Sequence, residues 1–346
     1  MKIRRNFFKT LILMVISSSL SLKSQTRTYL KNHNLKTVKK GFIGNSFVNG
    51  TFQNLYGKSD MSSLYDIFKW KLEKNPKKEI KENENYTLEV IKDPSILETQ
   101  KDYICWLGHA SFLIQINGKR ILTDPCLTSP PFIKRHTELP FPIKDIKPEY
   151  LLISHGHYDH LDSDTIKHFH HSVALVPLKM SKLIKKINPT ISTQESGWYQ
   201  QYAIAEDFDI YLLPAHHWHK RGLADKDEVL WGSFLIKTKH KSIYFGGDSG
   251  YSKHFKDIYT TFGKIDIAIL PIGAYAPRWF MRPSHMNPSE ALKAYKDLHA
   301  TTLIPMHFGT FDLSDEPLGE PEQILRKIGE KENIHFLTIG QKSNIK

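Results

Sequence analysis

Residues 154–162 carry the sequence SHGHYDHLD, and this stretch decides the fold. It continues the apolar run YLLIS of residues 150–154, which predicts a strand, so its polar side chains lie in the loop at the carboxyl end of that strand. Loops in this position often carry chemistry because the sheet holds them rigidly. The loop offers four potential metal ligands within six residues, namely His155, His157, Asp159 and His160.

The ligand types in this loop indicate the kind of metal. Imidazole together with carboxylate suits Zn²⁺, and it also suits iron or manganese. A turn can aim His155 and His157 at one ion, while Asp159 and His160 reach a second ion beside it, and Gly156 permits the tight backbone path. The chain has 18 histidines, so scattered pairs arise by chance. A packed cluster directly after an apolar strand is different, and it predicts a dinuclear metal site.

Strand and helix patterns alternate on both sides of this cluster. Predicted strands are Tyr103–Leu107, Ser111–Ile116, Arg120–Asp124, Tyr150–Ser154, Val173–Pro177, Asp209–Leu213, Ser233–Thr238, Ser242–Phe245, Asp266–Leu270 and Thr302–Pro305. Predicted helices are Ser163–Phe169, Ser181–Ile187 and Pro288–His299, and the sequence Asn-Pro-Ser-Glu predicts a cap for the last of them. Short strands interleaved with helices predict a layered α/β domain over residues 101–346.

The N-terminal hundred residues differ from the rest. A basic start followed by the apolar run Thr10–Leu22 is typical of a signal peptide, and the run is short for a membrane span. Residues 1–22 therefore predict export to the periplasm, the cell envelope or the medium, with the segment cleaved or retained as an anchor. Residues 23–100 show few strand patterns, and we expect them to form an extension packed on the core. Within it, Ser63–Lys74 has helical spacing and Asn75–Glu84 predicts an exposed linker.

Composition narrows the function classes. With 40% hydrophobic residues among 346, the chain can bury a core and is not a disordered protein. The net charge of +12 favours anionic partners such as phospholipid head groups, nucleic acid or phosphorylated substrates, although a merely basic surface would give the same number. The two cysteines, Cys105 and Cys126, are too few for a disulfide framework; they are either buried thiols or one disulfide of an exported protein.

The motif His-x-His-x-Asp-His resembles the signature of the metallo-β-lactamase superfamily, an αββα sandwich with a dinuclear metal site. Three later stretches that follow strands fit the same resemblance: PAHHW (214–218), GGDSG (246–250) and MHFGT (306–310). The resemblance implies two sets of three ligands and one bridge: His155, His157 and His217 for the first ion, Asp159, His160 and His307 for the second, and Asp248 between them. His216 and His219 flank His217, so that assignment could shift.

Other stretches resemble the branch of N-acyl-phosphatidylethanolamine-hydrolysing phospholipase D. They are WLGHA (106–110), LTDP (122–125), PAHHWHKR (214–221), GDSGY (247–251) and PIGAYAPRWF (271–280), followed by His285. The resemblance covers about residues 100–313 and touches FVNG (47–50). It implies a hydrolase that binds two Zn²⁺ ions per chain and cleaves this phospholipid, or a related one, with a hydroxide that bridges the ions. It also implies a homodimer.

Several residues receive provisional roles from these patterns. Asp159 and His285 are the candidates for direct catalysis, with His285 as a donor or acid at the phosphoryl group. His109 and Asp124 are expected to orient metal ligands, since metal-bound histidines usually need a partner for the other ring nitrogen. Residues 278–280 (Arg278, Trp279 and Phe280) are expected either to form an apolar, cationic rim for a lipid or only to pack their loop.

Other functions remain open at this point. A general phosphodiesterase or a sugar-phosphate lactonase-like hydrolase of the same fold would need no lipid-sized groove. A non-catalytic binding protein would have lost ligands, and all seven expected ligands are present. The expected partner is a phospholipid or a membrane surface. Nucleic acid is not expected, because no appended nucleic-acid domain is evident and export argues against RNA.

Overall fold

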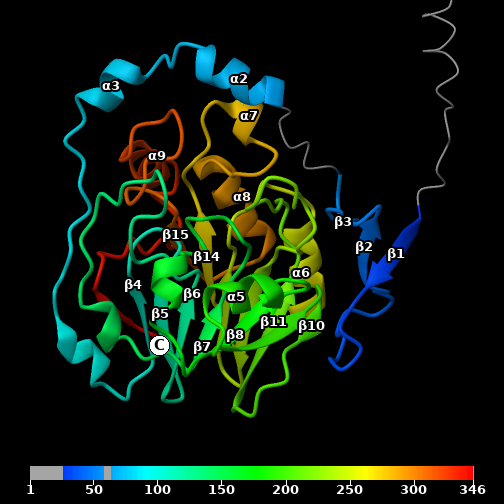
Figure 1. Ribbon diagram of the computed structural model, residues 1–346. Helices are drawn as coiled ribbons and strands as arrows, with labels where there is room; N and C mark the ends of the chain where they lie inside the picture. The colour runs from blue at the N-terminus through cyan, green and yellow to red at the C-terminus, as the bar shows by residue number, and fades with distance from the viewer. Residues whose placement is uncertain (1–25, 58–63, 346) are drawn as a thin grey trace, which may run out of the picture.

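The computed structural model describes residues 26–57 and 64–345, and two sheets facing each other form its centre (Figure 1). A seven-stranded sheet runs in the order β16 (Lys342–Asn344), β4 (Tyr103–Trp106), β5 (Phe112–Ile116), β6 (Lys119–Thr123), β7 (Tyr150–Leu152), β8 (Val173–Pro177) and β9 (Ser192–Ser196). A six-stranded sheet runs in the order β10 (Gln200–Gln201), β11 (Phe208–Leu213), β12 (Ser233–Thr238), β13 (Ser242–Phe245), β14 (Ile267–Pro271) and β15 (Thr302–Met306).

Each sheet is buried on both faces, and this explains the continuous apolar runs of its strands. In β4 the alternate residues Ile104 and Trp106 enter the core between the sheets, while Tyr103 and Cys105 join a second core on the opposite face. Since side chains alternate along a strand, a strand covered on one face alone would have alternated with polar residues. Cys105 and Cys126 are both buried free thiols.

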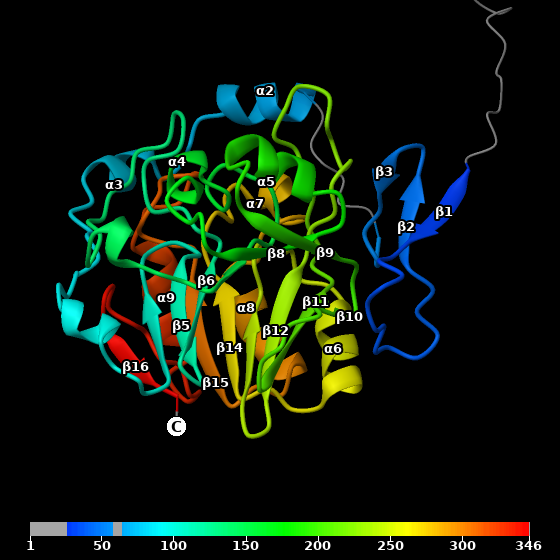
Figure 2. The ribbon, with the colours of Figure 1, turned by 60° about the horizontal axis from the view of Figure 1, so that its bottom comes forward.

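Helices cover the outer faces and complete four layers (Figure 2). The short helices α4 (Ser163–Ile166) and α5 (Ser181–Ile187) lie over the seven-stranded sheet, and Ile166 and Ile184 enter its outer core. Three helices cover the other sheet: α6 (His254–Phe262), α8 (Pro288–Asp297) and α9 (Glu320–Ile328). The short α7 (Arg278–Met281) lies between β14 and α8. The predicted αββα sandwich is confirmed.

The extension runs around the sandwich (Figure 1). It begins with a small antiparallel sheet of β1 (Arg27–Leu30), β2 (Asn45–Val48) and β3 (Thr51–Phe52), beside β10. It then passes over the upper end of the sheets as α2 (Leu64–Leu72) and α3 (Lys78–Glu82), and descends through a 3-10 turn at Pro94–Leu97 to β4. A second 3-10 turn, Ile143–Asp145, precedes β7. We call α2, α3 and the residues joining them the arch.

The structure corrects several details of the predictions. The extension has strands that we did not predict, because β1 exposes most of its side chains and so lacks an apolar pattern. The predicted linker Asn75–Glu84 is exposed but contains the helix α3. The predicted helix Ser163–Phe169 ends early, at Ile166. The cap of α8 is confirmed: Asn287 and Glu290 form a reciprocal capping box.

The terminal segment predicted for export, residues 1–22, lies outside the described residues. Within the part of the chain that the structure describes, no helix has the length and apolar character needed to cross a membrane.

Candidate metal centre

The residues proposed as metal ligands all follow the ends of strands at one edge of the sandwich. The 154–162 loop follows β7, His217 follows β11, Asp248 follows β13 and His307 directly follows β15. Parallel pairing of β13, β14 and β15, and of β6, β7 and β8, makes these strands end together. The two sheets therefore bring ligands from distant parts of the sequence to one place.

Three imidazoles form the first group, which we call the first triad: His155, His157 and His217. His155 Nε2 lies 2.9 Å from His157 Nδ1, and His217 Nε2 lies 3.3 Å from the same atom. His155 and His217 are completely buried. Burial lowers the pKa of His157 to about 3 and lowers the pKa values of the other two rings well below the usual histidine value.

Hydrogen bonds behind the first triad fix the tautomers of two rings. The carbonyl oxygen of Ser284 can only accept, so His217 Nδ1 carries the proton and donates it at 3.0 Å. Ser154 Oγ donates to Asp124 and therefore accepts from His155 Nδ1 at 2.9 Å. Both Nε2 atoms then present lone pairs toward the centre.

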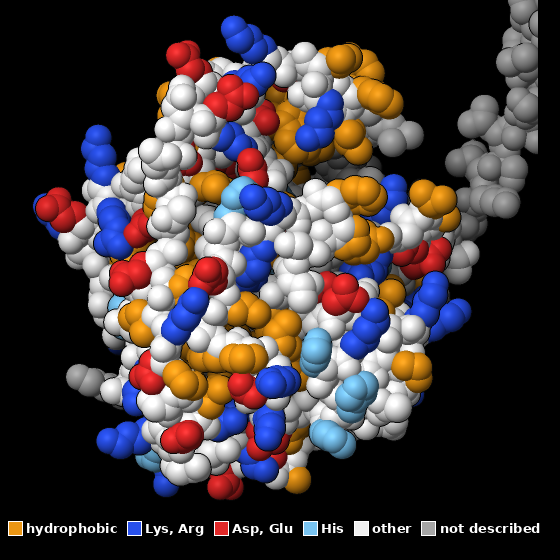
Figure 3. Space-filling view, turned by 60° about the vertical axis from the view of Figure 1, so that its left-hand side comes forward, with side chains coloured by type: hydrophobic (Ala, Val, Ile, Leu, Met, Phe, Trp, Pro, Cys, Tyr) orange, Lys and Arg blue, Asp and Glu red, His pale blue; other side chains and the backbone are white. Residues whose placement is uncertain are grey.

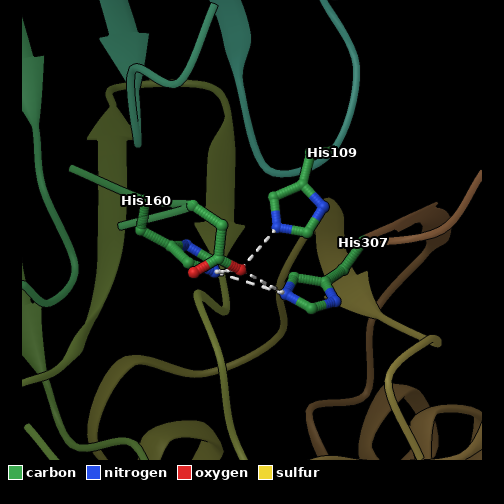
Figure 4. A group of neighbouring side chains, drawn as sticks. His109, His160 and His307 are labelled. Atoms are coloured by element: carbon green, nitrogen blue, oxygen red, sulfur yellow. Dashed lines mark hydrogen bonds and ion pairs between the residues drawn. The ribbon is translucent and has the colours of Figure 1, made fainter. Parts of the chain in front are cut away.

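The second group, which we call the second triad, combines Asp159, His160 and His307. His160 Nε2 lies 3.4 Å from Asp159 Oδ2 and 3.3 Å from His307 Nε2. Figure 4 shows the rings of His109, His160 and His307 directed toward one carboxylate, that of Asp159. Burial alone would lower the pKa values of His160 and His307. The carboxylates of Asp248 and Asp159 have the opposite and larger effect: they raise the pKa of His160 well above normal and that of His307 to about 9.

Asp248 lies between the two triads. Its Oδ2 is 3.9 Å from His217 Nε2 and 3.3 Å from His160 Nε2, and its Oδ1 is 3.0 Å from His307 Nε2. Although burial alone would raise the pKa of Asp248, His160 and His307 hold it well below the usual range. One ionised carboxylate is therefore shared by both triads.

The residues fit a pair of bound cations. In the first triad two lone pairs point at His157 Nδ1, and a single N–H there can satisfy one of them. A cation among the three nitrogens satisfies all of them at once. Within each triad the ligand atoms lie within 4.8 Å of one another. Imidazole with carboxylate is a donor set suited to zinc, iron or manganese.

A family model described as the β-lactamase superfamily domain matches residues 119–308, a range that contains all seven candidate ligands. The chain belongs to the β-lactamase superfamily. Among curated relatives, an N-acyl-phosphatidylethanolamine-hydrolysing phospholipase D of Saccharomyces cerevisiae is 36% identical over 66% of this chain and 52% of its own length. A protein of the same name from Caenorhabditis elegans is 31% identical over 68% of this chain and 73% of its own length. The chain thus spans about half of the yeast relative.

Solved structures agree on the fold of this superfamily member. A metallo hydrolase from Ignicoccus hospitalis has a TM-score of 0.56 at 22% identity, and the match covers 71% of this chain and 99% of that one. A diiron β-hydroxylase from Streptomyces venezuelae has a TM-score of 0.55 at 18% identity, covering 71% of this chain and 55% of that one. The chain has the fold and the converging ligands of a metal-dependent hydrolase.

The two residues expected to orient metal ligands, Asp124 and His109, lie beside the second triad. Asp124 Oδ2 accepts from His160 Nδ1 at 2.7 Å, so Nε2 of that ring faces the centre. His109 Nε2 lies 3.0 Å from Asp159 Oδ2. His109 also belongs to a group that could hold an ion together with Asp159, His160 and His307. Of the residues beside His217, His216 donates from Nδ1 to the carbonyl of Pro283 instead.

His219 has a packing role beneath the metal loop. A Cβ atom on Gly156 would lie 2.2 Å from His219 Cε1, so only glycine fits between the two ligands His155 and His157 while that ring is in place. His219 is completely buried and, among the described residues, neither ring nitrogen has a hydrogen-bond partner. Burial lowers its pKa to about 4, so the ring is neutral at physiological pH.

Sequence reasoning missed two residues that hold the ligands. Asn54 of the extension donates from Nδ2 to the carbonyl of His217 at 2.8 Å, and its Oδ1 accepts from the N–H of His217 at 3.2 Å. Arg221 donates to the carbonyls of Gly156 and Leu161 and so holds both sides of the metal loop. Arg221 ends the stretch PAHHWHKR but received no role from it, and Asn54 lies in none of the quoted stretches and is 163 residues from His217 in the sequence.

The expected substrate rim packs against the arch. Phe280 lies 4.8 Å from Trp70 of α2, ring centre to ring centre, and Trp279 donates from Nε1 to Glu73. Arg278 donates to Glu290 at 2.7 Å and to the carbonyl of His285, so its charge is already paired within the protein. His285 Nδ1 lies 3.7 Å from Asp248 Oδ2, which places this ring beside the ligands.

Proposed function

We propose that this protein is a zinc-dependent phosphodiester hydrolase that cleaves a phospholipid in the manner of phospholipase D, with N-acyl-phosphatidylethanolamine or a related lipid as substrate. The observation that carries the proposal is the similarity, at 31% and 36% identity, to two proteins named for that activity. We propose that the protein acts outside the cytoplasm on a membrane surface, as the N-terminal pattern and the basic charge indicate.

The first and second triads, with Asp248 shared between them, are the residues that would hold two ions. When bound there, such ions supply Lewis acidity and lower the pKa of water toward neutrality. Ser154 and Asp124 hold the rings of His155 and His160, and Asn54 holds the backbone of His217. The ligand nitrogens are therefore already aimed, so that little reorganisation is needed.

His285 is suited to donate a hydrogen bond to a phosphoryl oxygen. Burial lowers its pKa to about 4, although Asp248 opposes the shift, so the ring is neutral at pH 7 and one nitrogen carries a proton. Its Nδ1 has no hydrogen-bond partner among the described residues. The donation of Arg278 to the His285 carbonyl fixes the backbone that carries this ring.

The test compares N-acyl-phosphatidylethanolamine vesicles with a soluble chromogenic phosphodiester at matched metal content. The lipid is expected to have the higher kcat/KM. Trp279→Ala is expected to lower kcat/KM for the lipid about tenfold, the effect of losing a large apolar contact, and to change soluble turnover little. Tyr259→Ala is the matched control, because Tyr259 is 36% exposed and Trp279 42% exposed, and α6 is not part of the rim.

A strong preference for soluble esters over every lipid would instead favour the general phosphodiesterase or lactonase-like function. Equal losses on both substrates would assign Trp279 to packing against the arch.

A further inference from the structure

The most exposed large hydrophobic side chains cluster around the metal centre. Among the described residues, six such side chains have exposures between 63% and 108%: Phe132, Leu223, Leu72, Tyr65, Phe68 and Ile80. Figure 3 shows one group of hydrophobic side chains at the upper end of the molecule, the end where α2 lies in Figure 1, and others over the middle and lower parts of the same face. We call these six side chains the metal-end surface.

Hydrogen bonds place two of the segments at this end. The loop of Phe132 is held by Arg135, which donates to the carbonyls of Leu107 and Cys126, after β4 and β6. The loop of Leu223 is held by Arg221, which donates to carbonyls of the metal loop. Both side chains are almost fully exposed, so they gain no burial from the folded chain.

The arch supplies the other four side chains. The inner side of α2 packs on α7, with the Lys69 ammonium 4.3 Å from the ring centre of Trp279. Tyr65, Phe68 and Leu72 follow at intervals of three and four residues, so they form one stripe on the solvent side of the helix. Ile80 of α3 is also exposed, and ion pairs of Lys77 with Glu320 and of Lys81 with Asp312 hold the arch at this end.

We propose that the metal-end surface inserts into the outer region of a phospholipid bilayer. The six side chains stand on three segments, namely the arch and the loops of Phe132 and Leu223. Exposed lysines such as Lys71 and Lys134 lie beside them in the sequence. Aromatic and aliphatic side chains that enter the acyl boundary, with lysines left at the head groups, are the pattern of an interfacial protein. The inference rests on the proposed function, because docking in this orientation turns the metal centre toward lipid.

Labelled single cysteines test the orientation directly. The native thiols Cys105 and Cys126 are buried, so an environment-sensitive dye would attach at an introduced cysteine. The dye on full-length Leu223→Cys is expected to shift its emission to the blue with vesicles of phosphatidylcholine and phosphatidylglycerol. The same dye on Ile43→Cys, an exposed site of the extension, is expected not to shift. This comparison is insensitive to binding by residues 1–22, which both proteins carry.

A second variant tests the energetic role of the surface. Phe132→Ser combined with Leu223→Ser is expected to lower turnover of lipid in vesicles about 100-fold, about tenfold for each lost apolar side chain. Turnover of the soluble phosphodiester is expected to stay unchanged, and Ile43→Ser is expected to match the parent on both substrates.

Three results would overturn the proposed surface: no shift at position 223, an equal shift at position 43, or a dye response that follows dimerisation without vesicles. If the dyes respond as expected but no phospholipid is hydrolysed, the surface stands and the proposed function fails. If phospholipid is hydrolysed while position 223 stays in water, the function stands and the surface fails.

Discussion

The two triads of the metal centre are supported in opposite ways. Behind the first triad stand uncharged groups: the Ser154 hydroxyl, the Ser284 carbonyl and the Asn54 amide. The second triad contains Asp159, and His160 also contacts the carboxylates of Asp124 and Asp248. The first triad therefore has neutral rings whose lone pairs face one another, whereas the second triad holds protons and ion pairs.

This difference determines what an incoming cation replaces. At the first triad a cation relieves unpaired lone pairs and displaces no proton from His155 or His217, since their pKa values lie well below normal. At the second triad it displaces protons that carboxylates stabilise on His160 and His307. We therefore expect ion binding at the two triads to depend differently on pH.

Asp248 contacts both triads, so we expect its removal to impair ion binding at both of them. Asp248→Ala is expected to lower turnover about 1000-fold or more, because one side chain serves both ions. Metal analysis should show loss at both sites. Asp164→Ala is the control, since that carboxylate is exposed and pairs with Lys167 away from the triads. Full activity of Asp248→Ala would remove the assigned bridge.

Lowering the pH is expected to weaken ion binding at the second triad much more than at the first. His307, with a pKa of about 9, is protonated at pH 7 in the metal-free protein, so the second ion must release that proton. His160 also carries a proton that the second ion must displace, since its pKa is raised well above the usual value. Lowering the pH from about 8 to about 6 should therefore weaken the second ion at least about 100-fold, tenfold per pH unit for each proton displaced. The first ion should be nearly unaffected, because His157 titrates near pH 3. Dialysis against a buffered chelator with metal analysis measures both occupancies; simultaneous loss would contradict the comparison.

The neutral support of the first triad can be tested alone. Asn54→Ala is expected to weaken the first ion about tenfold, because the backbone of His217 loses its side-chain partner. Asn45→Ala is the matched control. Asn45 also lies in the extension, and its side chain accepts a hydrogen bond from a backbone group of the core, the N–H of Trp198. If both variants lose metal equally, the extension acts through general stability. Competition with a chromogenic chelator gives the affinities.

The sequence predicted the core strands well because their apolar runs reflect burial on both faces. It failed for β9, whose residues STQES are mostly polar, and for β1, whose side chains are mostly exposed. It also gave no boundaries for α6 and α9. These elements depend on pairing and packing partners distant in the sequence, so local pattern carries little of their signal.

Local sequence identified the candidate ligands but not the distant residues that hold them. The motif after β7 was enough to nominate His155, and the family resemblance nominated Asp248. The structure brings all seven nominated residues together. The hydrogen bonds of Asn54 and Arg221 were inaccessible, since they join a side chain to a distant backbone carbonyl that any residue could provide. The pairing of Arg278 with the Glu290 carboxylate was also inaccessible, because the two side chains lie 12 residues apart on different helices.

The contact of Gly156 with His219 has a consequence for sequence evolution. A side chain at position 156 needs the volume that the imidazole at position 219 occupies. Two positions 63 residues apart are therefore coupled, and related chains with a larger residue at 156 should carry a smaller one at 219. Tyr158, by contrast, is partly exposed in the same loop, so substitutions there should accumulate independently of position 219.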